Sequence, residues 1–214
     1  MEARDTETGE RLSDRQLRDE VITLYLAGHE TTANLLTWAF YALGSQPEVS
    51  ARLESEADAL GDGAPTLDAL KGQGYAPMVL SEVLRLYPPA WTIARDVVAE
   101  DVACGYRIPA GSFVLLSPFI TQRLAEFWPD PLRFDPERFS AANARKRHPF
   151  AWFPFSAGPR VCIGKYFSLY EAQSVLAMVM REFRVRLMVE QLGFRAEGTL
   201  HPDRPVMVRL ESRQ

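Results

Sequence analysis

Cysteine is scarce in this chain, which holds only Cys104 and Cys162 among its 214 residues. Neither has a second thiol or a histidine beside it at metal-site spacing, so the sequence argues against a disulfide framework and a zinc site and favours a reducing compartment. Basic residues are not in excess either, because 24 lysines and arginines stand against 28 acidic residues. We therefore expect no nucleic-acid partner.

The start of the chain lacks an apolar run. Residues 1–14 are polar and acidic, so we expect neither a secretory signal nor a membrane anchor in them. Hydrophobic residues nevertheless make up 47% of the whole chain, which is enough for a folded core. This balance is typical of a globular protein.

A long helix is predicted between Ser13 and Gly44. Ser13 and Gln16 fit a capping box, and glycine commonly ends helices. From Val21 to Leu43 this helix is apolar on nearly every side, as expected of a helix buried in the middle of a domain. One stripe at helical spacing is small or polar: Thr23, Ala27, Glu30, Thr31 and Asn34. The polar residues at the helix centre make a membrane span unfavourable.

The rest of the chain predicts a mainly α fold with a small β component. Helical patterns cover residues 47–60, 66–71, 77–86 and 165–182. Short strands and hairpins are predicted over residues 92–118, and paired strands over 184–210. Residues 129–160 contain six prolines and predict an irregular coil, and a coil of that length in a compact protein is usually functional.

Cys162 lies where this coil ends and the last long helix begins. Unpaired N–H groups and the positive dipole end of a helix start favour a thiolate, and Arg160 adds a positive charge nearby. Gly158 and Gly164 carry no Cβ and let the backbone pass close to a bulky ligand. A lone cysteine is more often a buried small hydrophobic residue, so this alternative stays open from Cys162 alone. Cys104, beside a turn glycine, receives no role.

The segment from Phe155 to Gly164 reads F-x-x-G-x-R-x-C-x-G and resembles the cysteine-ligand loop of the cytochrome P450 superfamily. Three further motifs agree in order: residues 27–32 resemble the oxygen-activating segment of the family's central helix, residues 82–85 supply E-x-x-R, and residues 135–139 match the P-E-R-F box. The resemblance implies that residues 1–214 are the carboxy-terminal, haem-binding part of a single cytochrome P450 domain, from the central helix through the cysteine loop. The family's amino-terminal helices have no counterpart in this chain.

The resemblance implies a haem b (iron protoporphyrin IX) cofactor with Cys162 as the axial thiolate ligand of its iron. Glu30 and Thr31 would face the oxygen-binding side of the haem and organise proton delivery, and Gly28 would leave room there. An alternative for Thr31 is a hydroxyl that bonds back to the carbonyl one turn earlier and only bends the helix.

Two arginines match the family's propionate-binding positions. These are Arg160 in the cysteine loop and Arg95 in the strand after the E-x-x-R helix, and buried propionates need such cationic partners. The alternative for Arg95 is an ordinary surface arginine. Phe155 would pack near the sulfur and limit water there, and Gly158 would let the loop approach the cofactor.

Glu82 and Arg85 lie three residues apart on a helix whose other positions are apolar, so their face is expected to be buried. By the resemblance, Arg138 joins them in a structural network that positions the cysteine loop; an ordinary helix ion pair is the alternative. The chain departs from the family at Gln122-Arg123, which stand where a His-Arg pair is common.

The implied activity is a monooxygenase, an oxidoreductase that inserts one atom of O2 into an apolar substrate with electrons from a ferredoxin, flavodoxin or flavin reductase. Residues 145–148, Arg-Lys-Arg-His, provide either a docking site for an acidic donor or a solvated basic loop. Two other functions stay open: a haem-thiolate isomerase or sensor, and a fragment inactive alone. We expect a cytoplasmic protein of a bacterium, with any membrane anchor lying outside these residues.

Overall fold

The computed structural model describes residue 4, residues 9–189 and residues 191–213. Helix α1 (Asp14–Ser45) starts as predicted, because the Ser13 side chain accepts the Gln16 N–H and the Gln16 side chain accepts the Ser13 N–H at 2.9 Å. The predicted stop at Gly44 is wrong, since the helix continues through it. A Cβ on Gly44 would lie 2.9 Å from the Cβ of Leu187 in strand β5 (Phe183–Leu187), so this glycine allows close packing.

The other helices follow the predicted order. The longer ones are α2 (Pro47–Asp58), α4 (Tyr75–Leu86) and α7 (Lys165–Glu182), with short helices at α3 (Leu67–Gly72), α5 (Pro118–Thr121) and α6 (Ala141–Ala144). Helix α4 begins two residues earlier than the predicted 77. The cause is Glu56 of α2, whose carboxylate accepts the N–H groups of Gly74, Tyr75 and Ala76 at 2.7, 2.7 and 2.8 Å.

Within the described ranges, the β component consists of four two-stranded antiparallel sheets. The pairs are β1 (Ile93–Asp96) with β4 (Phe113–Leu116), β2 (Asp101–Ala103) with β3 (Tyr106–Ile108), β5 with β8 (Val208–Ser212), and β6 (Phe194–Ala196) with β7 (Leu200–Pro202). Cys104 and Gly105 form the two-residue turn between β2 and β3, with φ of 51° and 81°. The predicted coil over 129–160 is interrupted only by α6 and by the 3₁₀ turns Pro136–Phe139, Pro149–Ala151 and Gly158–Arg160.

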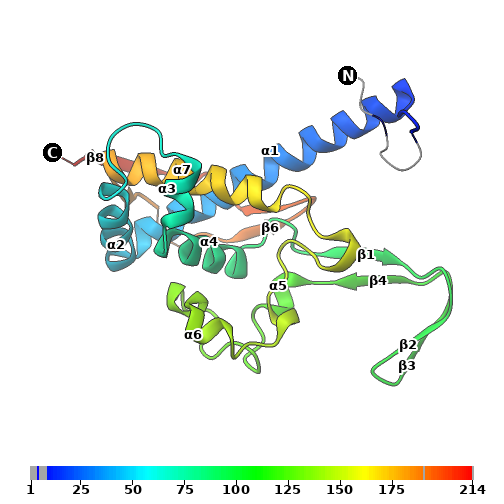
Figure 1. The fold of residues 1–214 in the computed structure, drawn as a ribbon. Coiled ribbons are helices and arrows are strands. Elements are labelled where there is room, and N and C mark those ends of the chain that lie inside the picture. The colour runs from blue at the N-terminus through cyan, green and yellow to red at the C-terminus, as the bar shows by residue number, and fades with distance from the viewer. Residues whose placement is uncertain (1–3, 5–8, 190, 214) are drawn as a thin grey trace.

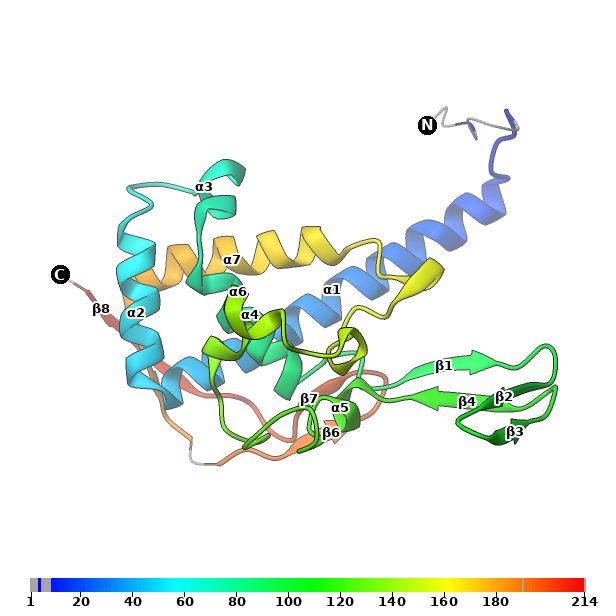
Figure 2. The same cartoon turned by 60° about the horizontal axis from the view of Figure 1, so that its bottom comes forward.

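The core lies around the second half of α1. Figure 2 shows α4 and α7 beside this half, with α2 across their ends. Its largest fully buried side chains include Leu35, Trp38, Leu80, Leu176 and Met180. The Trp38 ring also stacks on the ring of Tyr87 at a centroid distance of 4.1 Å. These contacts hold the four helices as one body.

The first half of α1 is bare. Its side chains from Asp14 to Glu30 are exposed, and this part projects away from the other helices (Figure 1). The large exposed apolar residues on it are Leu17, Val21, Ile22, Leu24, Tyr25 and Leu26. The prediction of burial on most sides is therefore correct for the part after Glu30 and wrong for residues 21–30, whose side chains are exposed. Within the described residues, no helix combines the length and apolarity needed to cross a membrane.

Candidate functional site

The cysteine loop is closed by a backbone hydrogen bond. The Cys162 N–H donates to the Phe155 carbonyl at 2.9 Å, and Gly158 takes a φ of +67°, which favours glycine. Gly164 is the N-cap of α7, and the Cys162 Sγ lies 3.9 Å from where a Cβ on this glycine would be. The loop therefore presents the sulfur just ahead of the helix start.

The thiol of Cys162 is free and exposed, so the alternative of a buried small hydrophobic residue does not apply. Its neighbours are large and apolar but uncovered: Val161, Ile163, Tyr166 and Phe167 have exposed fractions of 50%, 91%, 66% and 75%. Uncovered apolar side chains beside an exposed thiol are a candidate surface for an apolar partner. An apolar cofactor that accepts a sulfur ligand would fit these neighbours.

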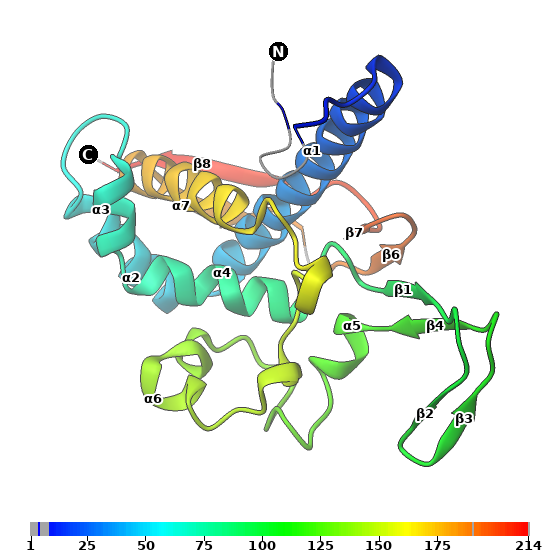
Figure 3. The ribbon, with the colours of Figure 1, turned by 45° about the vertical axis from the view of Figure 1, so that its right-hand side comes forward.

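The loop is flanked by two projecting elements. In Figures 1 and 2 the free half of α1 and the β1–β4 pair extend on the same side of the molecule, and the yellow segment ahead of α7 lies between them; Figure 3 shows the same segment beside β1. Arg95 of β1 is half-buried, and its Nη2 donates to the Ser156 Oγ at 3.3 Å. This bond brings Arg95 to the cysteine loop, whereas Arg160 on the loop itself is exposed.

The three residues of α1 that were predicted to lie at the oxygen-binding side are Gly28, Glu30 and Thr31. Thr31 Oγ1 donates to the Ala27 carbonyl at 2.7 Å, which is the helix-bending bond of the alternative interpretation. Thr23 and Thr37 make the same kind of bond at 2.8 Å each, so this bond does not distinguish Thr31. Gly28 has open space around it, since a Cβ added there would meet no atom within 4 Å. Glu30 is exposed and accepts a hydrogen bond from Thr199.

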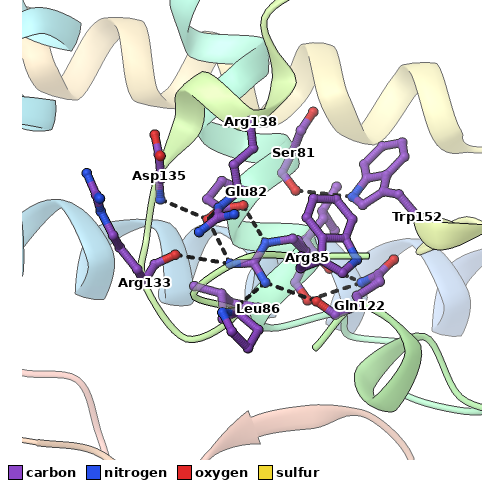
Figure 4. Close-up of polar contacts among 12 residues, drawn as sticks. Ser81, Glu82, Arg85, Leu86, Gln122, Arg133, Asp135, Arg138 and Trp152 are labelled. Carbon is purple, nitrogen blue, oxygen red and sulfur yellow. Dashed lines mark hydrogen bonds and ion pairs between the residues drawn. The ribbon is translucent and has the colours of Figure 1, made fainter. Parts of the chain in front are cut away.

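Glu82, Arg85 and Arg138 lie together (Figure 4). Arg85 and Glu82 are fully buried and form a two-point ion pair, with N–O distances of 2.6 and 2.8 Å, while the Arg138 Nε lies 3.5 Å from Glu82 Oε1. The Asp135 N–H also donates to this carboxylate at 2.8 Å. Burial raises the pKa of Glu82, and the ion pair with Arg85 opposes that rise.

This network extends to the backbone of the proline-rich coil. The Arg85 guanidinium donates to the carbonyls of Gln122, Pro131 and Arg133 at 3.0, 2.6 and 3.2 Å. Two of these carbonyls, those of Pro131 and Arg133, belong to the coil, so the buried Arg85 holds the coil in place more firmly than an exposed helix ion pair would.

Sequence reasoning did not assign a role to Gln122, whose side chain is fully buried. Its amide nitrogen donates to the Leu84 and Arg85 carbonyls at 3.0 and 3.1 Å, and its amide oxygen accepts the Phe153 N–H at 3.0 Å. It thus ties the end of α4 to the segment that enters the cysteine loop. The signal in the sequence was the departure from His-Arg at this position.

The neighbouring Arg123 is also largely buried. Its guanidinium donates to the Leu86 and Phe119 carbonyls and lies over the Phe119 ring at 3.6 Å. Burial lowers the pKa of Arg123 to about 10, so it stays charged at neutral pH.

The basic segment 145–148 does not act as one exposed cluster. The Arg147 guanidinium lies over the Trp128 and Phe139 rings, 4.4 and 4.5 Å from their centroids, and also donates to the Arg138 carbonyl. Burial lowers the pKa of Arg147. Arg147 is therefore a packing residue, and within this segment Arg145, Lys146 and His148 remain exposed.

Comparison with known proteins shows the family of this chain. The "Cytochrome P450" family model matches residues 1–208, and the chain belongs to this family. "Cytochrome P450 4V2" of Homo sapiens is 37% identical over 210 residues, covering 96% of this chain and 40% of that protein. "Cyclooctatin synthase" of Streptomyces melanosporofaciens is 40% identical over 185 residues, covering 86% of this chain and 40% of that protein.

The fold matches solved structures as well. The crystal structure of the cytochrome P450DA heme domain superposes with a TM-score of 0.93 at 35% identity, over 99% of this chain and 47% of that chain. The chain therefore has the carboxy-terminal portion of the cytochrome P450 fold. It spans about 40% of the length of the two curated relatives named above. Those relatives are mammalian and bacterial, so the expected bacterial source stays a prediction.

Proposed function

We propose that this chain supplies the haem-binding part of a haem-thiolate monooxygenase that inserts one oxygen atom from O2 into an apolar organic substrate. The observation that carries the proposal is the exposed thiol of Cys162 ahead of α7, surrounded by uncovered apolar side chains in a chain of the cytochrome P450 family. When bound, haem b supplies the redox chemistry that activates O2, and a thiolate ligand favours cleavage of the O–O bond.

The residues around the sulfur have separate tasks. The Cys162 Sγ binds the iron, and Gly158 and Gly164 keep the loop free of side chains on its cofactor side. Phe155 is half-buried within the loop and limits the access of water to the sulfur. Arg95 and Arg160 bind the two haem propionates. The hydrogen bond from Arg95 to Ser156 supports this role, because it holds the Arg95 guanidinium beside the loop.

On α1, Glu30 and Thr31 hold and deliver protons on the oxygen-binding side, and Gly28 leaves open space for oxygen. Catalysis by such groups depends on their position, because proton transfer requires a continuous hydrogen-bonded path to the reacting group. The half-buried Thr31 lies at the boundary between the free and packed halves of the helix. It is thus both supported by the core and accessible from the free side.

The buried residues act on the site from a distance. Glu82, Arg85 and Arg138 position the coil that precedes the cysteine loop, and Gln122 positions the entry to the loop through Phe153. We assign these four residues to structure and not to chemistry.

The chain also needs partners. The substrate is a small apolar molecule, and the electron donor is a ferredoxin, a flavodoxin or a flavin reductase. An acidic donor would meet Arg145 and Lys146, the exposed cations of the basic segment.

The test of the proposal is the spectrum of the haem-loaded, reduced, carbon monoxide-bound protein. A thiolate ligand gives a strongly red-shifted Soret band, so this band should be present in the parent protein and lost in Cys162→Ser. The matched control is Cys104→Ser, which changes the other exposed cysteine, in the β2–β3 turn, and should keep the band. Retention of the band in Cys162→Ser, or its loss in Cys104→Ser, would overturn the assignment of the ligand.

A further inference from the structure

The turn between β6 and β7 is held against α1 and the chain entering β1. The Leu200 N–H donates to the Pro89 carbonyl at 2.9 Å, and the Leu200 carbonyl accepts the indole N–H of Trp38 at 3.3 Å. The indole N–H of Trp91 donates to the Glu197 carbonyl at 2.9 Å. These bonds use backbone atoms of the hairpin, so they place Thr199 beside α1 whatever its side chain is.

The Thr199 hydroxyl lies between two residues of the polar stripe of α1. The Asn34 amide nitrogen donates to Thr199 Oγ1 at 2.9 Å, and Thr199 Oγ1 donates to Glu30 Oε1 at 2.5 Å. Glu30 and Asn34 are four residues apart on one face of the helix, whereas Thr199 is 165 residues from Asn34 in the sequence. The side chain of Asn34 thus bonds to Thr199, which is not among the residues assigned to cofactor binding.

The direction of this chain of hydrogen bonds follows from the atoms. A threonine hydroxyl has one proton to donate and two lone pairs that accept. Because the Asn34 N–H group occupies an accepting position, the hydroxyl proton is free to point at Glu30. A charge-assisted bond of this kind is stronger than a neutral one, and it restricts an otherwise exposed and flexible carboxylate.

We propose that Thr199 is a positioning residue for Glu30, and that Asn34 orients the Thr199 hydroxyl for this purpose. The inference rests on the proton-delivery role of Glu30 in the proposed function. It adds that the carboxylate is held in place from the carboxy-terminal hairpin, and not by α1 alone.

The first measurement needs no turnover. It is the infrared spectrum of the resting haem-loaded protein. For each variant, a second spectrum is recorded with Glu30→Gln added, and subtracting the two spectra isolates the carboxylate band of Glu30. Thr199→Val removes the hydroxyl at nearly constant shape and should move the band to the position of a carboxylate without this bond. Thr199→Ser restores the hydroxyl and should restore the band. Thr37→Val, which removes a hydroxyl of α1 that donates to the Ala33 carbonyl, is the matched control and should leave the band unchanged.

Thr199→Val could also loosen the hairpin. Loss of hydrogen-exchange protection at the Leu200 N–H would reveal this, and a second variant then decides the test. Asn34→Asp replaces the donor with an acceptor that competes for the Thr199 proton, and it leaves the backbone bonds of the hairpin in place. It should move the Glu30 band in the same direction. A band unaffected by Thr199→Val in a docked hairpin, or by Asn34→Asp, overturns the inference.

The second measurement is the amount of product formed per electron in the haem-loaded protein with its substrate. Thr199→Val should lower it on the order of tenfold through misplacement of Glu30, and Thr199→Ser should restore it. If the band moves but product per electron does not change, Thr199 does not position Glu30 for proton delivery. If the parent protein oxidises no substrate at all, the proposed function fails, while the infrared result still decides whether Thr199 holds Glu30.

Discussion

The two halves of α1 have opposite surroundings, and the charged residues of the helix all lie in the first half. Both carry large apolar residues on several sides, yet Leu35, Trp38 and Leu43 are at most 2% exposed, whereas Val21, Leu24 and Leu26 are 57–63% exposed. The buried half meets α4, α7 and α2, whereas the side chains of the other half are exposed, with Glu30 at its end bonded to Thr199. Apolar periodicity thus predicts that a helix face needs cover, but the cover itself is a property of the rest of the fold.

The same contrast separates the two groups of functional candidates. The Glu82 and Arg85 side chains lie at 0% exposure with their bonding groups paired, whereas Cys162, Glu30 and Arg160 are exposed. The Glu82–Arg85 pair is therefore complete within this chain, whereas the buried Nε of Arg138 has no hydrogen-bond partner among the described residues. Cys162 and Arg160, which would bind the cofactor, instead lie on the exposed surface of the chain.

The largest expected effect tests whether the bare half needs a cover. Expressed by itself, the chain should self-associate and hold haem weakly, because uncovered apolar surface costs roughly 25 cal/mol per Å². Size-exclusion chromatography and haem titration measure both properties. Leu24→Glu should shift the chain toward monomer, whereas Thr23→Glu, on the neighbouring polar position, should not. A monodisperse chain that binds haem tightly would contradict the need for a cover.

The second effect concerns the buried ion pair. Glu82→Gln should destabilise the haem-loaded protein by about 3–5 kcal/mol, because it leaves the charge of Arg85 buried without a carboxylate. Urea unfolding followed by tryptophan fluorescence gives the change in the free energy of unfolding. The control is Glu211→Gln, which removes a half-exposed pair with Arg186 at 3.2 Å and should cost less than about 1 kcal/mol. Equal losses of unfolding free energy in the two variants would show that burial does not determine how much the Glu82–Arg85 pair stabilises the protein.

The third effect compares two threonines with the same backbone bond. Thr31→Ala should keep haem and substrate binding but lower product formation by on the order of 100-fold and divert electrons to peroxide, because a proton-delivering group is lost. Thr37→Ala loses the equivalent bond to the Ala33 carbonyl within the packed half and should stay coupled. Peroxide yield and product per electron are the measurements. Unchanged coupling in Thr31→Ala would remove the proposed role.

The smallest effect compares two glycines of α1. Gly44→Ala should destabilise the protein by about 1–3 kcal/mol, since its Cβ would lie 2.9 Å from Leu187 Cβ and 3.0 Å from Leu187 N. Gly28→Ala meets no atom within 4 Å and should stabilise the helix by up to about 1 kcal/mol. Thermal unfolding of both variants measures the difference. A stable Gly44→Ala variant would show that β5 can move away from α1.

The sequence predicts most of the local structure because the signals are local. The Ser13 capping box, the turn at Cys104-Gly105 and the start of α7 after Gly164 each depend on neighbouring residues. The four motifs likewise indicate the family, since each is a short stretch of sequence.

What could not be predicted depends on contacts between distant segments. Glu56 moves the start of α4, Leu187 explains Gly44, and Thr199 is the partner of Glu30 169 residues away. The inward turn of Arg147 onto Trp128 and Phe139 is of the same kind. Sequence periodicity and residue propensity cannot predict these pairs, because the pairs form only when the helices and the coil pack together in three dimensions.

The bare half of α1 also has a mechanical consequence. With 32 residues, α1 is a rod of roughly 48 Å, clamped over its second half. A tilt of about 5° at the clamp would displace the far end, about 25 Å away, by roughly 2 Å, yet it would scarcely move a group near the pivot. Glu30 and Thr31 lie at that pivot, where the rod leaves its clamp. Bending of the uncovered arm would thus leave the two groups assigned to proton delivery nearly in place.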